Sequence, residues 1–432
     1  MRLSFAKVAV AASTAVILAA CAMPADDPNY NASAAAVDPA DASAAAVSQE
    51  ALSAALAPPT SIGVDAPLPA APAAGATIIN LTTGSEFETV FDTALDAAAQ
   101  TLGWTVENVT VSLSDPTSAA TAFDEALAKK PAGIRIDGTI ADSVLDGLTK
   151  AQTAGVPVVC TGCSATAVGA DISIDGSEQN VSWGQAMATY VVTSSQTLGQ
   201  SATVQVIPMP GGAISDFNTA FNDSLMSQCR ECGATVSTLD PTMTDMADPA
   251  SLTAFAVSEL STSMAGWALL DSGALSAGTA DALATDPTML SPVVVVGRGA
   301  AASDVAALQA LGGAGGGAAA PSASAVASAE PSTAASAEAS AAASGDAAEV
   351  LGMTPEQASS LQAWIAIPQP VMAWRVVDQF ARLIGGGEPA TGPLPSQLLT
   401  GENAPTAVLD ENGNYIGIAD YQDQFKALWG VK

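Results

Sequence analysis

The sequence predicts an α/β fold in which strands alternate with helices. Short apolar runs recur through 77–311 and 349–432, and stretches with apolar residues at helical spacing lie between them. Strands joined by helices of about 10–15 residues indicate crossover units in parallel sheets. Two tracts rich in Ala, Ser, Pro and Gly, at 22–76 and 312–348, precede and interrupt this alternation.

The first half of the pattern begins with a strand at 77–81 and an amphipathic helix at 87–102, which Gly103 closes. The alternation then continues with strands at 105–111, 134–138 and 156–159 and with helices at 124–129 and 144–154.

The second half repeats the alternation. We expect helices at 183–199, 216–228, 252–264 and 276–284, and strands at 202–207, 234–239, 267–270 and 293–296. The chain is long enough for two domains of ordinary size after the low-complexity tracts are set aside.

The N-terminus has the pattern of an export signal. A positive start, Met1 to Lys7, precedes an apolar run at 8–20 that stops at Leu18-Ala19-Ala20-Cys21. The end of this segment resembles a bacterial lipoprotein signal, which implies that 1–21 is the signal and that the Cys21 thiol is acylated. The alternative is an ordinary secretory signal with a cysteine nearby. We expect an extracytoplasmic protein, anchored to the cell membrane by a lipidated Cys21.

Composition excludes several functions. Asp and Glu total 43 against 12 Lys and Arg, a net charge of -31, so we expect no nucleic-acid partner. The chain contains no histidine, which removes the usual general base and the commonest metal ligand. The sequence therefore favours binding over catalysis, and we expect no enzyme activity, no metal and no cofactor.

The two low-complexity tracts hold few large apolar side chains, so their burial would not offset the loss of chain entropy. We interpret 22–76 as a disordered tether. The tract at 312–348 is expected to be a disordered insert on the surface of a folded region, because a long loop adds little closure entropy.

Several short motifs resemble one family. They are Ser85-Glu86-Phe87 after the first strand, Lys130-Pro131-Ala132-Gly133-Ile134, Ala154-Gly155-Val156-Pro157-Val158-Val159, Asp175 with Trp183-Gly184, the helix at 374–387, and Leu399-Thr400-Gly401-Glu402-Asn403. In their order and spacing they resemble the type I periplasmic binding proteins, in the ribose-binding subgroup of sugar receptors.

The resemblance implies two parallel-sheet lobes that are joined by three crossovers and close over a ligand. It assigns 77–174 and 368–394 to lobe 1, and 175–367, with the insert, and 395–432 to lobe 2. It further implies a monomer that captures a small polar, sugar-like ligand and delivers it to an ABC permease. A ligand sensor or a degenerate interaction module of the same fold is the alternative.

The sequence departs from the family at three expected sugar contacts. Phe217 stands where the family has an arginine, Asp271 lies one place early, and Gly297-Arg298-Gly299 replaces a Gly-x-Asp. Either the ligand is not an ordinary pentose or hexose, or the site has decayed.

Seven residues are candidates for ligand binding. Phe87 and Trp183 would stack on the ligand from opposite lobes, unless they pack at helix starts. Asp137, Thr139 and Thr161 follow strand ends and would bind hydroxyl groups, although Asp137 could instead cap the next turn. Asp271 and Arg298 lie at strand ends of lobe 2, and a surface salt bridge is the alternative for Arg298.

Two Cys-x-x-Cys pairs are present, Cys160 with Cys163 and Cys229 with Cys232. In a cytosolic protein this spacing would suggest zinc, but an export signal places the chain in an oxidising compartment. We therefore expect two local disulfides.

Overall fold

The computed structural model describes residues 49–84, 86–112, 115, 117–164, 170–209, 212–236, 249–276, 279, 282–283, 292–313 and 354–431. The signal at 1–21, its Cys21 and most of the insert at 312–348 lie outside these residues. Within them, none of the helices combines the length and the apolar character needed to cross a membrane.

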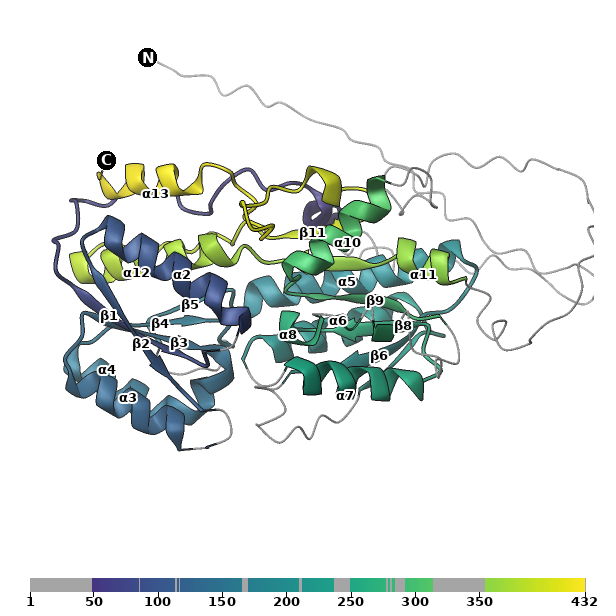
Figure 1. Cartoon of the computed structure of the whole chain (residues 1–432), viewed down its shortest axis with the longest axis horizontal. Coiled ribbons are helices and arrows are strands. Elements are labelled where there is room, and N and C mark those ends of the chain that lie inside the picture. The colour runs from purple at the N-terminus through teal and green to yellow at the C-terminus, as the bar shows by residue number, and fades with distance from the viewer. Residues whose placement is uncertain are drawn as a thin grey trace, which may run out of the picture.

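The first sheet has five parallel strands in the order β2-β1-β3-β4-β5 (Figure 1). They are β1 (Thr77–Thr82), β2 (Thr105–Thr110), β3 (Gly133–Asp137), β4 (Val158–Thr161) and β5 (Ile172–Ile174). Its helices are α2 (Glu86–Thr101), α3 (Ser118–Ala128), the 3-10 helix η1 (Gly138–Val144), α4 (Leu145–Ala154) and α12 (Gln369–Gly385). In Figure 1, α2 and α12 cover one face of this sheet and α3 and α4 cover the other.

The second sheet has six strands in the order β11-β10-β9-β8-β6-β7, and only β11 pairs antiparallel to its neighbour. The strands are β6 (Thr203–Ile207), β7 (Gly233–Val236), β8 (Trp267–Leu270), β9 (Val294–Arg298), β10 (Ala363–Ala366) and β11 (Gln397–Thr400). The helices are α5 (Ser177–Thr197), α6 (Ile214–Gln228), α7 (Pro249–Ser261), α8 (Gly273–Ser276), α10 (Ala302–Gly313) and α11 (Pro355–Ser360). The predicted α/β class with two parallel-sheet lobes is confirmed.

Each lobe buries apolar side chains on both sides of its sheet. In the first lobe, Phe91 of α2 lies in one core cluster and Phe123 of α3 in another. In the second lobe, Phe217 of α6 and Leu252 of α7 are likewise in different clusters. Three crossovers join the lobes, after β5, after β10 and before β11, as the resemblance implied, and the chain then returns to the first lobe with its C-terminal helix.

The C-terminal helix α13 (Tyr421–Trp429) packs on the first lobe, although the resemblance placed all of 395–432 in lobe 2. The rings of Trp374 in α12 and Trp429 stack with centroids 5.2 Å apart. Trp429 Nε1 also donates to Asp378 Oδ1 at 3.0 Å. Thus β11 and the short 3-10 helix η4 (Ala404–Thr406) belong with the second sheet, whereas α13 completes the first lobe.

The expectation of a disordered tether at 22–76 is wrong for residues 49–76, which we call the N-terminal strap. The strap begins with a helix at 49–56 and then runs to β1, with Leu52 and Ile62 fully buried. Its backbone is held on both lobes, because Gln397 of β11 donates to Leu56 O at 2.9 Å and Arg375 of α12 to Gly63 O at 2.7 Å. Few large side chains are needed for this packing, since the contacts use backbone carbonyl groups.

Candidate functional site

A buried arginine organises the strand ends of the first lobe. Arg135 of β3 is 2% exposed, and its guanidinium donates to Asn80 Oδ1 at 3.2 Å and to Thr161 Oγ1. It also pairs with Asp137 Oδ2 at 3.2 Å and lies 4.3 Å from the ring centroid of Phe91. Because these groups come from neighbouring strands and from α2, Arg135 fixes their relative positions at one edge of the sheet.

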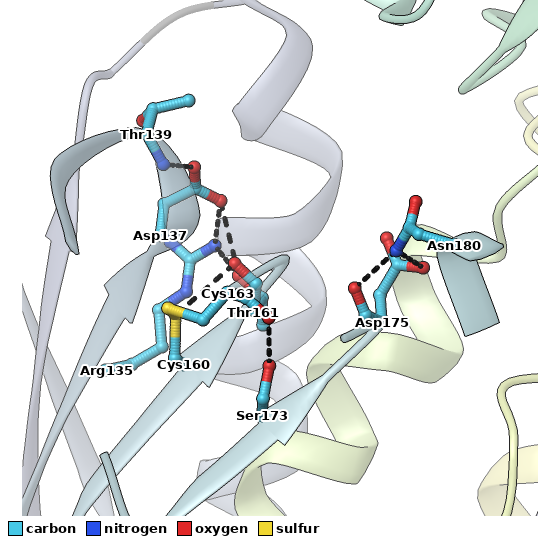
Figure 2. Close-up of a disulfide and its surroundings, with 9 residues drawn as sticks. All are labelled: Arg135, Asp137, Thr139, Cys160, Thr161, Cys163, Ser173, Asp175 and Asn180. Carbon is cyan, nitrogen blue, oxygen red and sulfur yellow. Dashed lines mark hydrogen bonds and ion pairs between the residues drawn. A yellow bond between two sulfur atoms is a disulfide. The ribbon is translucent and has the colours of Figure 1, made fainter. Parts of the chain in front are cut away.

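The structure brings three predicted residues together around this arginine (Figure 2). Asp137 Oδ1 accepts from the backbone N–H of Thr139 at 2.9 Å, and Thr161 Oγ1 donates to Asp137 Oδ2 at 3.3 Å. Asp137 therefore caps η1, which was the alternative considered for it, and it also neutralises Arg135. Thr139 Oγ1 is buried and has no partner among the described residues.

A second ion pair lies where the chain first crosses between the lobes. Arg298, at the end of β9, pairs with Asp175, and both side chains are buried. Asp175 has a φ of 55°, a left-handed conformation that few side chains adopt, and Asn180 of α5 donates to its carbonyl oxygen at 2.7 Å. Burial raises the pKa of Asp175, although Arg298 opposes that shift. The salt bridge of Arg298 is therefore internal and not a surface pair.

Asp271 lies at the end of β8 and is fully buried. Its carboxylate accepts two hydrogen bonds from Met209 N, at 2.8 and 3.0 Å, and another from Asn218 of α6. Burial raises the pKa of Asp271 to about 7, although Asn218, Met209 and Arg298 favour its ionised form.

Of the two aromatic candidates, only Trp183 has a described side chain. Phe87 lies in the first turn of α2, and its side chain is outside the described residues. Trp183 of α5 is 8% exposed and belongs to the same apolar cluster as Phe217 and Phe221. That position supports packing for Trp183, so stacking of either ring on a ligand stays a prediction.

The strand-end loops of the two lobes touch. Gly162, after β4, accepts a hydrogen bond at its carbonyl oxygen from Ala213 N at 2.7 Å. At the start of α6, Asp216 Oδ2 accepts from Ser164 at 3.0 Å and from Ser177 at 2.6 Å. Lobe 1 and lobe 2 are thus in direct contact beside the polar groups described above.

Both cysteine pairs form disulfides, as expected. Cys160 and Cys163 have Cα atoms 5.8 Å apart, and Cys229 and Cys232 have Cα atoms 5.2 Å apart. The described residues contain no group of three or more acidic or cysteine side chains arranged to hold a metal ion.

Two cavities formed by described residues lie away from the strand ends. One, of about 600 Å³, lies between the strap at Ser61 to Pro69 and the loop at Gly387 to Gly392. The other, of about 350 Å³, lies against α3, η1 and α4 and is lined by Asp124, Asp142 and Asp146. Neither cavity contains a residue predicted to bind ligand.

Sequence reasoning missed Arg135, Asn180 and Asn218. A signal existed for Arg135, since a single charge stands inside the apolar run Ile134-Arg135-Ile136. The two asparagines lie in helices whose composition does not distinguish them.

No family model matches the chain, and no curated protein matches it. Solved structures do. A carbohydrate transporter from Acidothermus cellulolyticus 11B, in complex with myo-inositol, matches with a TM-score of 0.54 and 13% identity, over 81% of this chain and 99% of that one.

Two further structures match over 76% of this chain and 95% of theirs. A carbohydrate transporter solute-binding protein from Agrobacterium radiobacter, in complex with D-arabinose, has a TM-score of 0.53 and 13% identity. An ABC transporter solute-binding protein from Agrobacterium vitis, bound with α-D-tagatopyranose, has a TM-score of 0.51 and 17% identity. At this level of identity the likeness concerns the fold, and this chain has the two-lobed α/β fold of the type I periplasmic binding proteins.

Proposed function

We propose that the chain is an extracytoplasmic solute-binding lipoprotein that captures a small polar, sugar-like ligand between its lobes for an ABC importer. It acts by binding and lobe closure and carries out no chemistry. The fold and the sugar-binding proteins that share it support this proposal.

The observation that carries the proposal is a set of buried polar atoms without partners, at the strand ends of the two lobes and in the first turns of helices α5 and α6 beside them. Among the described residues, Thr139 Oγ1, Asn180 Oδ1, Asn218 Oδ1 and Arg298 Nε have no hydrogen-bond partner. An unsatisfied buried polar atom costs about 1–3 kcal/mol, so several of them where the two lobes meet favour a ligand that supplies the missing bonds. Hydroxyl groups both donate and accept, which fits this mixture of acceptors and a donor.

The pairing of the Arg and Lys side chains in the two lobes predicts which ligands do not bind. Between residues 131 and 374 the sequence contains four cations, Arg135, Lys150, Arg230 and Arg298. Arg135 is paired with Asp137, Arg298 with Asp175, and the exposed Lys150 with Asp124 on the outer helices. Arg230 follows the end of α6 that is remote from the lobe contact. Both described cations at these strand ends, Arg135 and Arg298, are therefore already paired with carboxylates, and the ligand should be neutral or basic.

A thermal-shift screen tests the proposal. The full chain carrying Cys21→Ser is heated with neutral sugars, polyols, nucleosides, amino sugars and sugar acids. A ligand at about 100 times its Kd stabilises the folded state by about 2.7 kcal/mol, so a binder raises the Tm measurably. A neutral or amine-bearing compound should do so. A panel in which no compound raises the Tm would overturn the function.

A further inference from the structure

We propose that the Cys160–Cys163 disulfide positions the loop through which the two lobes close. Closure would then depend on this disulfide and not on Cys229–Cys232. The inference concerns the contact between lobes, so it holds for whichever ligand binds between them.

The contact is made by the residues that the disulfide encloses. Thr161 and Gly162 lie between the two cysteines, directly after β4. The carbonyl oxygen of Gly162 accepts from Ala213 N of the second lobe at 2.7 Å. One residue beyond the disulfide, Ser164 donates to Asp216 at the start of α6. The disulfide loop is thus the part of lobe 1 that reaches α6.

The loop is held rigidly in its own lobe. Gly162 N donates to Ile174 O at 2.8 Å, and Ser173 Oγ donates to Cys163 O at 2.9 Å. Gly162 has a φ of 71°, the left-handed region that glycine adopts without strain, and both cysteines are at most 1% exposed. These restraints leave the Gly162 carbonyl group directed at the other lobe.

Three glycines make the contact so close that a small shift of the loop would break it. A Cβ atom at Gly138 would lie 2.1 Å from Gly162 O, and one at Gly212 would lie 2.4 Å from the same atom. Neither position can accept a side chain without movement, so bare backbone from both lobes meets here. A hydrogen bond weakens steeply when its distance or angle changes. The bond from Ala213 N to Gly162 O therefore requires that the disulfide loop keep its position.

The loop also supports the polar groups of lobe 1. Thr161, inside the disulfide, binds both Arg135 and Asp137 (Figure 2). The Cys160–Cys163 disulfide therefore positions two things: the contact between the lobes and the lobe 1 side of the candidate site.

The second disulfide offers a matched control. Cys229–Cys232 has the same spacing and joins the end of α6 to β7. The lobe contact is at the other end of α6, whose 15 residues span about 22 Å. Loss of Cys229–Cys232 therefore removes a disulfide of the same kind and leaves the lobe contact unchanged.

Hydrogen–deuterium exchange measures the contact directly, because the Ala213 amide is the donor. We compare Cys160→Ser/Cys163→Ser with Cys229→Ser/Cys232→Ser, both in the full chain carrying Cys21→Ser. Loss of the first pair should speed exchange in the peptide that contains Ala213 by about tenfold or more, whereas β8 peptides exchange as in the parent. Loss of the second pair should leave the Ala213 peptide unchanged.

A second pair of variants keeps both disulfides. Gly138→Ala pushes on Gly162 O and should also speed exchange at Ala213, whereas Gly233→Ala, which meets nothing within 4 Å, should not. This pair reports on the contact even where a cysteine variant fails to fold. The proposal would be overturned if exchange in the Ala213 peptide stayed unchanged after Gly138→Ala or after loss of Cys160–Cys163. It would also be overturned if loss of either disulfide had the same effect on that peptide.

Discussion

Arg375 should fasten the N-terminal strap to the first lobe, and its replacement by methionine tests this. The side chain is 2% exposed and donates to four backbone carbonyl groups. Two belong to the strap, Ile62 O at 3.3 Å and Gly63 O at 2.7 Å. Two belong to the loop after α12, Ala390 O and Gly392 O, both at 2.9 Å. Methionine keeps much of the apolar volume and removes every one of these bonds.

The expected loss follows from two opposing terms. Each hydrogen bond to a charged donor contributes about 1.5–3 kcal/mol, so four of them contribute on the order of 6 kcal/mol or more. Burial, the main cause, lowers the pKa of Arg375 to about 10, which corresponds to a cost on the order of 3 kcal/mol for the charged form. We therefore expect Arg375→Met to lower the free energy of unfolding by about 3 kcal/mol.

Guanidinium unfolding followed by tryptophan fluorescence measures this change, and limited proteolysis measures release of the strap. Lys150→Met is the control, since Lys150 and Asp124 form an exposed pair that should contribute less than about 1 kcal/mol. Stability within about 0.5 kcal/mol of the parent, with the strap still resistant to protease, would show that the strap does not rely on Arg375.

Three further predictions concern other parts of the chain. Cys21→Ser should move the protein from the membrane fraction to the soluble fraction, and a variant that stays with the membrane would contradict lipidation. Deletion of 322–344 should leave the Tm within a few degrees, and a large loss would mean that the tract packs on a lobe. Burial raises the pKa of Asp271 in the folded state to about 7, well above that of an exposed aspartate, so its stabilising contribution is present at low pH and is lost as the pH rises toward 7. Relative to Asp271→Asn, the parent should lose about 1.4 kcal/mol per pH unit between about pH 4 and 7, and parallel stability curves would contradict the raised pKa.

The sheets were predictable because short apolar runs alternate with stretches at helical spacing. The runs at 134–138, 202–207 and 267–270 correspond to β3, β6 and β8 within a residue or two. Strand β5 was missed because it has three residues, too few for a periodic pattern. The strap was missed because backbone carbonyl groups bind Arg375, and a carbonyl acceptor has no sequence signature.

The parts of the candidate site that were predictable are those in which neighbouring parallel strands alone bring the residues together. Asp137 and Thr161 come together because β3 and β4 are parallel neighbours, so their carboxyl ends meet at one edge. The pairing of Asp175 with Arg298 was not predictable, because the partners are 123 residues apart and meet only through the crossover between lobes. The docking of α13 on α12 likewise depends on aromatic stacking between distant segments.

The central claim is the proposal that a neutral or basic sugar-like ligand binds between the lobes, and calorimetric titration of a matched series tests it most directly. The series consists of the neutral sugar, the amino sugar and the sugar acid built on the best scaffold from the thermal-shift screen. We predict saturable binding of the neutral or amine-bearing member with a Kd at least about tenfold lower than that of the acid, a difference of about 1.4 kcal/mol. Tightest binding of the acid would contradict the charge argument, and the absence of binding by all three would contradict the proposed function.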